Sequence, residues 1–171
     1  MQQRRLSHEF YCGDVLDIAP ALIGKAIVRS WEDGRQTRHI ITETEAYRGE
    51  EDLACHASKG KTTRTAVMYG EGGNLYMYLI YGMYWMMNVV TSVKDNPQAV
   101  LIRGLQDVSG PGRLTRRLQI DGSYNQENLI TSPRIWIEDN GFKVDFSTHK
   151  RIGIDYAGEI WKNKEWRFLK S

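Results

Sequence analysis

The chain has 171 residues and a formal net charge of +2 at pH 7, with 41% hydrophobic and 26% charged residues. This length fits one domain that buries about two-thirds of its unfolded surface. No segment approaches the roughly 18 uninterrupted apolar residues of a membrane span, and the charged start of the chain lacks the apolar core of a secretory signal. The composition therefore predicts an ordinary globular protein in the cytoplasm and excludes a polycation.

The two cysteines, Cys12 and Cys55, form no C-x-x-C pair. Isolated cysteines are typical of a reducing compartment. His56 follows Cys55, but a second pair at ligand spacing is missing, so we expect no metal site. Adjacent side chains point apart, which also argues against Cys55 as a nucleophile activated by His56.

The first predicted elements are a helix over residues 14–24, with Pro20 near its first turn, and a β-hairpin. The hairpin strands are expected at 25–31 and 39–46, joined by an Asp-Gly turn within 32–35.

A polar, glycine-rich stretch at 48–73 is predicted to be mostly loop, with one helical turn near 65–68. Loops held on a rigid frame commonly carry functional residues. We therefore expect part of any site to lie here.

The most unusual stretch is NLYMYLIYGMYWMMN at 74–88, which holds four of the nine tyrosines. Tyr76 and Tyr78 are two residues apart and share one face of a strand. Gly82 tolerates positive φ, so Tyr81-Gly82 is predicted as a hairpin apex. An aromatic ring then lies at an exposed tip, which core packing does not explain. The alternative is a central core strand with hydrogen-bonded tyrosines.

Beyond this stretch, the pattern predicts a turn at 95–98, a buried strand over 99–105 and a basic helix over 110–118. Further strands are expected at 133–138, 142–146 and 165–169. The whole chain is predicted as one α+β domain over residues 1–171. Its expected form is a curved, largely antiparallel β-sheet with flanking short helices and a protruding β-hairpin.

Two acids, Glu43 and Glu45, project to one face of the predicted strand and lie about 7 Å apart. Paired carboxylates at such a distance suit acid–base chemistry on a glycosidic bond. The alternative is a solvent-facing strand edge whose acids oppose Lys25 or Arg29. The side chains that could line one pocket with these acids are Tyr47, Asp52, Cys55 and His56.

Basic residues gather on both sides of the aromatic stretch. They are Lys59, Lys61 and Arg64 before it, and Arg103, Arg113, Arg116 and Arg117 after it. Such patches suit a nucleic-acid backbone, although a solvated face has the same pattern.

Several blocks of the sequence resemble the alkyladenine (3-methyladenine) DNA glycosylase family. They are TETEAYRG at 42–49 with the following EDLACHA, NLYMYLIYGMYWMMN at 74–88, VLIR at 100–103, GPGRL at 110–114, IDGSYNQENL at 120–129 and RIGIDYAGE at 151–159. The blocks appear in the family's order and extend over nearly the whole chain.

The resemblance implies a DNA glycosylase of base excision repair, a hydrolase that acts on N-glycosyl bonds. Its expected substrates are damaged purines in double-stranded DNA, of the 3-methyladenine, 7-methylguanine, hypoxanthine and ethenoadenine class, flipped out of the helix. No lysine matches a Schiff-base nucleophile, so a monofunctional enzyme that leaves an abasic site is implied. No cofactor is implied, and we expect a monomer, associated with the nucleoid if the source is bacterial.

The resemblance also implies the catalytic residues. Glu45 matches the general base that activates the attacking water. Arg103 and the main-chain carbonyl of Ile152 match the other groups that hold this water. A nearby arginine is expected to keep Glu45 ionised.

Tyr47 and Tyr78 match the rings that sandwich the extruded base. His56 matches an edge contact, with Ala54 beside it in the base-binding set. Asn88 matches the residue that crowds the 2-amino group of guanine.

Tyr81 matches the wedge that enters the minor groove, flanked by Met83 and Tyr84. Arg64 and Arg113 are the expected phosphate contacts.

Three residues depart from the family pattern: Trp85 and Met86, expected to alter the pocket floor, and Tyr156, where other members can carry histidine. Two other hypotheses use the same residues. One is a non-catalytic module that binds damaged DNA or RNA and needs neither Glu45 nor Arg103. The other is a carbohydrate hydrolase that uses the two acids of the 40–47 strand.

Overall fold

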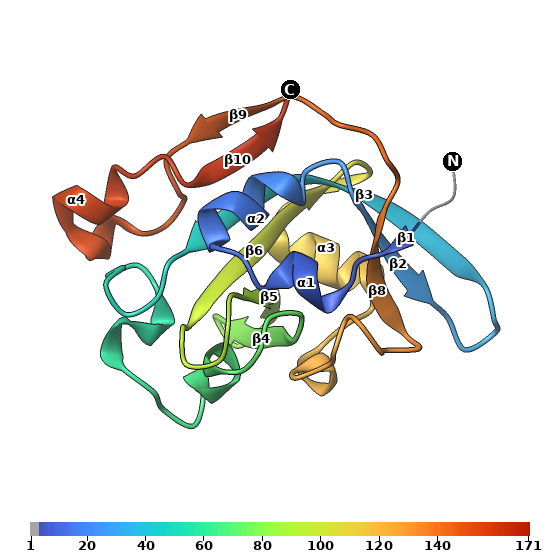
Figure 1. The fold of residues 1–171 in the computed structure, drawn as a ribbon, viewed down its shortest axis with the longest axis horizontal. Coiled ribbons are helices and arrows are strands. Elements are labelled where there is room, and N and C mark those ends of the chain that lie inside the picture. The colour runs from blue at the N-terminus through green and yellow to red at the C-terminus, as the bar shows by residue number, and fades with distance from the viewer. Residues whose placement is uncertain (1–3) are drawn as a thin grey trace.

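An antiparallel β-sheet is the frame of the computed structural model, which describes residues 4–171 (Figure 1). The strands are β1 Arg4–Arg5, β2 Ala26–Ser30, β3 Gln36–Tyr47, β4 Leu75–Ile80, β5 Tyr84–Thr91, β6 Gln98–Leu105, β7 Val108–Ser109, β8 Ile135–Asp139, β9 Phe146–His149 and β10 Arg167–Lys170. The α-helices are α1 His8–Tyr11, α2 Val15–Ala21, α3 Pro111–Leu118 and α4 Gly158–Lys162. Four short 3₁₀ turns are η1 His56–Lys59, η2 Thr65–Tyr69, η3 Gly122–Tyr124 and η4 Asp155–Ala157. The predicted α+β class with a largely antiparallel sheet is confirmed.

The long strand β3 connects two branches of this sheet. The main path runs β1-β8-β2-β3-β6-β5-β4, and β10 also pairs with β3. On one edge of β3, β2 pairs with residues 36–40 and β10 with 43–45. On the other edge, β6 pairs with 41–47. Glu43 and Glu45 therefore lie between β6 and β10, and the alternative in which they oppose Lys25 or Arg29 is wrong.

The core lies where α1 and α2 cover one face of the sheet (Figure 1). Thr44 faces this side, because its hydroxyl donates to the Ala19 carbonyl of α2 at 2.8 Å. Successive side chains of a strand alternate between faces, so Glu43, Glu45 and Tyr47 face the other way. The helix α3 packs on β5 and β6 and buries Leu114, Thr115 and Leu118.

The helix predicted at 14–24 is α2, which spans only Val15–Ala21. Asp14 caps it by accepting from the Leu16 amide at 2.8 Å. Pro20 lies in its last turn, not near its first as predicted. A proline costs only one intrahelical hydrogen bond there, and the helix ends one residue later. The strand predicted at 142–146 is also wrong: β9 begins at Phe146, where pairing with β10 begins. This partner is distant in sequence and left no local signal.

The hairpin predicted at 74–88 forms from β4 and β5. Its apex has Tyr81 at φ 51° and Gly82 at φ 66°, and the Met83 amide donates to the Ile80 carbonyl at 3.1 Å. Tyr81 is 87% exposed. The start of β4 packs in the core instead, where Leu75 is fully buried. The hairpin apex is confirmed, and the core-strand alternative is wrong for the tip.

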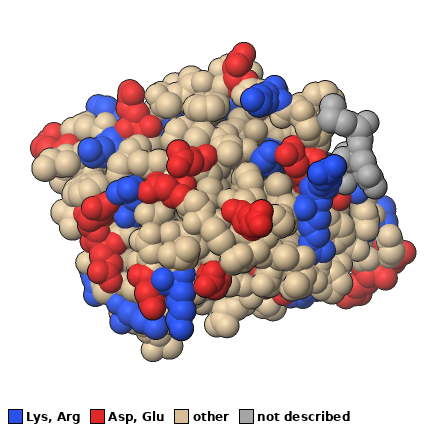
Figure 2. Space-filling view, in the orientation of Figure 1, with Lys and Arg blue, Asp and Glu red and all other residues tan. Residues whose placement is uncertain are grey.

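The face that bears α1 and α2 has charges of both signs. Lys and Arg side chains are interspersed there with Asp and Glu (Figure 2). This face therefore presents no continuous basic surface. Within residues 4–171, no helix combines the length and the apolar character needed to cross a membrane.

Candidate active site

A cavity of about 420 Å³ is bounded by β3, β6, the β4–β5 hairpin and the loop after β9. This volume is in the range of small-ligand sites. Eight of the predicted site residues line it: Tyr47, Ala54, His56, Tyr78, Tyr81, Asn88, Arg103 and Ile152. Those that do not are Glu45, Arg64, Met83, Tyr84 and Arg113. The structure thus brings together residues from widely separated blocks of the sequence.

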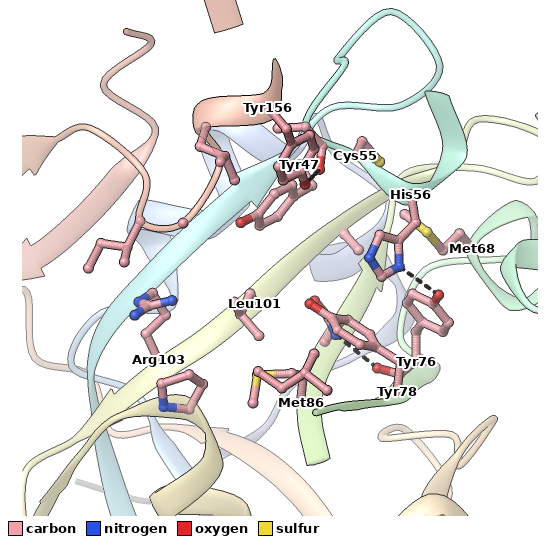
Figure 3. A pocket seen from close by; sticks show the side chains of 18 of the residues that line it. Tyr47, Cys55, His56, Met68, Tyr76, Tyr78, Met86, Leu101, Arg103 and Tyr156 are labelled. Atoms are coloured by element: carbon pink, nitrogen blue, oxygen red, sulfur yellow. Dashed lines mark hydrogen bonds between the residues drawn. The ribbon is translucent and has the colours of Figure 1, made fainter. Parts of the chain in front are cut away.

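Aromatic side chains form two sides of the cavity. Figure 3 shows Tyr47 on one side and Tyr78 with His56 on the other. The ring centroids of His56 and Tyr78 are 4.5 Å apart. At the rim, the Arg64 guanidinium lies 5.3 Å from the Tyr78 ring centroid, which is a cation–π distance. A flat ligand that enters this cavity has a ring available for stacking on each side.

His56 is a neutral polar group in the wall. Its Nδ1 lies 2.9 Å from the Tyr76 hydroxyl (Figure 3). Burial, reinforced by the charges of Arg64 and Lys59, lowers the pKa of His56 to about 4. The imidazole is therefore uncharged at neutral pH. Tyr76 was not among the predicted site residues, although its two-residue spacing from Tyr78 is the sequence signal that places it here.

The floor of the cavity includes Asn88, which is buried and donates from Nδ2 to the Tyr76 carbonyl at 3.1 Å. Met86 also lines the cavity, as expected. Trp85 does not reach the cavity floor, contrary to expectation. Its ring packs against Gly122 on the other side of β5, where a β-carbon at position 122 would lie 2.6 Å from the ring.

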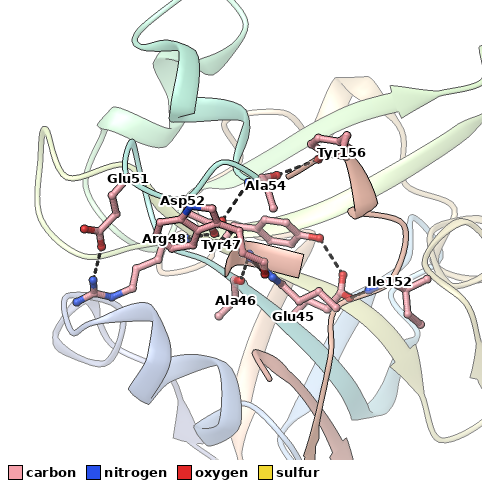
Figure 4. A network of polar contacts seen from close by, with 11 residues as sticks. Glu45, Ala46, Tyr47, Arg48, Glu51, Asp52, Ala54, Ile152 and Tyr156 are labelled. Carbon is pink, nitrogen blue, oxygen red and sulfur yellow. Dashed lines mark hydrogen bonds and ion pairs between the residues drawn. The ribbon is translucent and has the colours of Figure 1, made fainter. Parts of the chain in front are cut away.

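Tyr156 lines the cavity mouth from η4. Its hydroxyl donates to the Ala54 carbonyl at 3.1 Å (Figure 4). This bond connects the two loops that flank Tyr47.

Glu45 is fully buried. Figure 4 shows its carboxylate beside Tyr47 and Ile152, two residues that line the cavity. Its Oε1 accepts from the Tyr47 hydroxyl at 2.9 Å and from Arg103 Nη1 at 3.4 Å. Its Oε2 accepts from the Ile152 amide at 2.6 Å. All three donors belong to residues that line the cavity. A carboxylate has about four acceptor sites, so one remains for a further donor such as water.

The charge state of Glu45 reflects two opposing effects. Burial raises its pKa, and the Arg103 charge, the Ile152 amide and the Tyr47 hydroxyl oppose this in decreasing order. Arg103 acts in the expected direction, but burial is the larger effect. The carboxyl is therefore a stronger base than an exposed glutamate.

The contact made by Ile152 differs from the expected one. Its amide, rather than its carbonyl, is the group bonded to Glu45. The side chain of Ile152 is 48% exposed. The backbone amide thus holds the carboxylate, and a role of the carbonyl in holding water stays a prediction.

Asp52 does not line the cavity, contrary to expectation. It forms a fully buried ion pair with Arg151, with contacts of 2.6 and 3.0 Å. The Arg151 guanidinium also lies 4.9 Å from the Tyr47 ring centroid. No local pattern indicated Arg151, because its partner is 99 residues away.

Of the residues predicted to contact the DNA backbone or groove, only Tyr81 lines the cavity, and the other four lie outside it. Met83 is 58% exposed at the hairpin tip. Tyr84 is half-buried and packs on Gly112, where a β-carbon would lie 3.0 Å from its ring. Arg64 and Arg113 are exposed, which a phosphate contact requires. Their roles stay predictions.

Comparisons with known proteins agree with these features. A family model described as "Methylpurine-DNA glycosylase (MPG)" matches residues 9–109 and 106–171. A protein of Borreliella burgdorferi (strain ZS7), named "Putative 3-methyladenine DNA glycosylase", is 42% identical over 173 residues, which cover 93% of this chain and 92% of that protein. A protein of Rickettsia africae (strain ESF-5) with the same name is 42% identical over 168 residues, covering 94% of this chain and 87% of that protein.

Proposed function

Because this chain belongs to the methylpurine-DNA glycosylase family, we propose that it flips alkylated or deaminated purines out of duplex DNA and hydrolyses their N-glycosidic bond. The observation that carries this proposal is the aromatic-walled cavity with the buried Glu45 bonded to residues that line it. The substrate class is that of 3-methyladenine, 7-methylguanine, hypoxanthine and ethenoadenine.

Binding begins with extrusion of the base, which costs a few kcal/mol and least for a damaged or mispaired one. Tyr81 fills the vacated space, because its exposed ring at the hairpin tip also borders the cavity. The extruded purine stacks between Tyr47 and Tyr78, which returns about 1–3 kcal/mol. Alkylated purines with a positive charge are attracted further by the aromatic faces.

The chemical step uses Glu45 as general base. A water donates its proton to the carboxylate while its oxygen attacks C1′ of the sugar. The glycosidic electron pair leaves with the base nitrogen, so a cationic alkylpurine departs as a neutral molecule. Arg103 and the Ile152 amide hold Glu45 in place during this step. Arg103 has the charge to stabilise Glu45 in its ionised form.

Asn88 selects among purines in this proposal. Its amide is fixed by the Tyr76 carbonyl, so it cannot easily turn away from the cavity floor. A fixed side chain there crowds the 2-amino group of guanine and favours adenine-type bases. The product is an abasic site, because no lysine is among the described residues that line the cavity.

The test is release of hypoxanthine, 1,N6-ethenoadenine or 3-methyladenine from duplex DNA, followed by alkaline cleavage of the abasic strand. Glu45→Gln is expected to lower the release rate by about 10²–10⁴-fold and to retain binding of the damaged duplex. The matched control is Glu51→Gln, the same change at an exposed acid paired with Arg48. The proposal fails if the wild-type protein binds these duplexes but releases no base, or if Glu45→Gln releases base at the wild-type rate.

A further inference from the structure

Glu43 is the second acid of the strand that carries Glu45, and the proposed reaction does not use it. Its side chain is only 13% exposed, so it is not a solvated edge residue. Arg167 of β10 donates from Nη1 to Glu43 Oε1 at 3.1 Å. The same oxygen lies 3.4 Å from Arg103 Nε. Glu43 therefore connects two arginines from different strands.

Arg103 is shared between the two carboxylates. Its Nη1 lies 3.4 Å from Glu45 Oε1, and its Nε lies at the same distance from Glu43 Oε1. Its Nε is buried and has no hydrogen-bond partner among the described residues. The guanidinium is thus drawn toward Glu43 by charge and directs only one N–H at Glu45. Charges alternate in the order Arg167, Glu43, Arg103, Glu45.

The backbone makes room for this arrangement. The pairing of β3 with β6 is irregular at Glu43, which lies opposite Gly104. A β-carbon at position 104 would lie 3.2 Å from the Glu43 β-carbon and 3.5 Å from its Oε2. The missing side chain at Gly104 therefore provides the space that Glu43 occupies beside Arg103. Irregular pairing next to a site commonly re-aims a side chain.

We propose that Glu43, held by Arg167, is a positioning residue that sets how strongly Arg103 acts on Glu45. Its importance for base release rests on the proposed function, but the electrostatic relation itself does not. Glu43 weakens the effect of the Arg103 charge on Glu45. Glu45 therefore stays a stronger base. Arg167 limits this effect because it neutralises Glu43.

Two substitutions are expected to move the pKa of Glu45 in opposite directions. Glu43→Gln keeps an oxygen acceptor for Arg167 but removes the charge, so Arg103 acts fully on Glu45 and its pKa falls. Arg167→Gln leaves Glu43 with Arg103 alone, so the guanidinium turns toward Glu43 and the pKa of Glu45 rises. Each shift is expected to be about half a unit to one unit.

Neither variant replaces the other groups around Glu45, but Arg167→Gln also removes the hydrogen bond from Arg167 Nε to the Lys150 carbonyl at 2.8 Å, two residues before Ile152. The groups that act on Glu45 are the Tyr47 hydroxyl, the Ile152 amide and the Arg151 charge. Tyr78 and Tyr156 also lie near enough to feel the charge of Glu45. Opposite shifts therefore report on Glu43 and Arg167. A purely structural role for these residues would lower stability in both variants and would move neither titration.

The experiment is a ¹³C NMR titration of the glutamate side-chain carboxyls, in which the Glu45 signal is assigned by its loss in Glu45→Gln. The matched control is Arg38→Gln, which removes another arginine–glutamate pair of β3, that with Glu138. This control is expected to leave the Glu45 titration unchanged. Opposite shifts for Glu43→Gln and Arg167→Gln support the proposal, and an unchanged or raised pKa in Glu43→Gln overturns it.

Action through Arg103 is tested by repeating Glu43→Gln in an Arg103→Gln background. In this background, Glu43→Gln is expected to change the Glu45 pKa by less than half as much as it does with Arg103 present. An equally large change in both backgrounds would overturn the proposal. The titration needs no substrate, so a wild-type protein that releases no base would refute the glycosylase function and leave this result valid. In an active enzyme, the acid limb of the pH–rate profile for base release is expected to shift in the same direction as the Glu45 pKa.

Discussion

The Tyr47 hydroxyl joins the proposed stacking ring to the proposed general base. It donates to Glu45 at 2.9 Å. Burial, reinforced by the Glu45 charge, raises the pKa of Tyr47 well above its usual value, so the hydroxyl keeps its proton throughout the working pH range. In the proposed reaction, Tyr47 therefore stacks on the base with its ring face and holds the carboxylate with its hydroxyl.

Tyr47→Phe separates these two effects because it keeps the ring and removes the donor. A hydrogen bond to the ionised form lowers a carboxyl pKa, so its loss is expected to raise the pKa of Glu45 further. Glu45 must be ionised to accept a proton from water. The rate of base release should thus fall first at acidic pH and change least at alkaline pH.

Single-turnover rates across the pH range measure this effect. The control is Tyr69→Phe, which removes a tyrosine–glutamate hydrogen bond outside the cavity, that with Glu50. An acid limb at the wild-type position in Tyr47→Phe would contradict the assignment of Glu45 as the titrating base.

In the β4–β5 hairpin, the residues that stabilise the fold are separate from those proposed to contact DNA. Its base is part of the core, and its tip carries Tyr81 in the left-handed region, which is unfavourable for a bulky residue. Tyr84 packs against Gly112 at the start of α3 and fixes the direction of the hairpin. The exposed ring therefore adds little to folding and is free for the proposed insertion into DNA.

Tyr81→Ser is expected to slow base flipping by about 5- to 150-fold, which corresponds to a lost stacking contribution of about 1–3 kcal/mol. Stopped-flow fluorescence of an ethenoadenine duplex measures flipping, and thermal unfolding should show little change. Phe142→Ser removes an exposed ring elsewhere and serves as the control. Loss of the fold in Tyr81→Ser would show that the tip is structural.

Local sequence signals predicted the elements whose partners are close in the chain. The Asp-Gly turn, the Tyr81-Gly82 apex and Pro111 at the start of α3 each depend on neighbouring residues, and each is present. The position of β9 and the surroundings of Glu43 depend on β10, far along the chain. Periodicity contains no information about such a partner, so it placed the two carboxylates on one face of β3 without Arg167. Only the family resemblance put Arg103 beside Glu45.

At the scale of the whole molecule, the buried Asp52–Arg151 pair connects the loop after β3 with the loop after β9. Asp52 also accepts from the amides of Arg48 and Ala54, both at 3.0 Å. Arg151 donates to the Ala46 carbonyl at 3.0 Å as well. These contacts hold two walls of the cavity in one arrangement.

Asp52→Asn leaves the Arg151 charge buried without a counter-charge. The expected loss in unfolding free energy is about 3–5 kcal/mol, measured by chemical denaturation at neutral pH. Asp107→Asn breaks an exposed pair with Arg117 and a 3.6 Å contact with His39, and it is expected to cost less than about 1 kcal/mol. Equal losses in the two variants would contradict the structural importance of the buried pair.

The groups that enclose Glu45 also set an order for biosynthesis. Ile152 follows it by 107 residues, and Arg167 follows Glu43 by 124. A growing polypeptide on the ribosome therefore carries a hydrated, ordinary glutamate at position 45 while most of the sheet is being made. The burial that raises the basicity of Glu45 is complete only when these late segments dock, so the proposed reaction must wait until translation is far advanced.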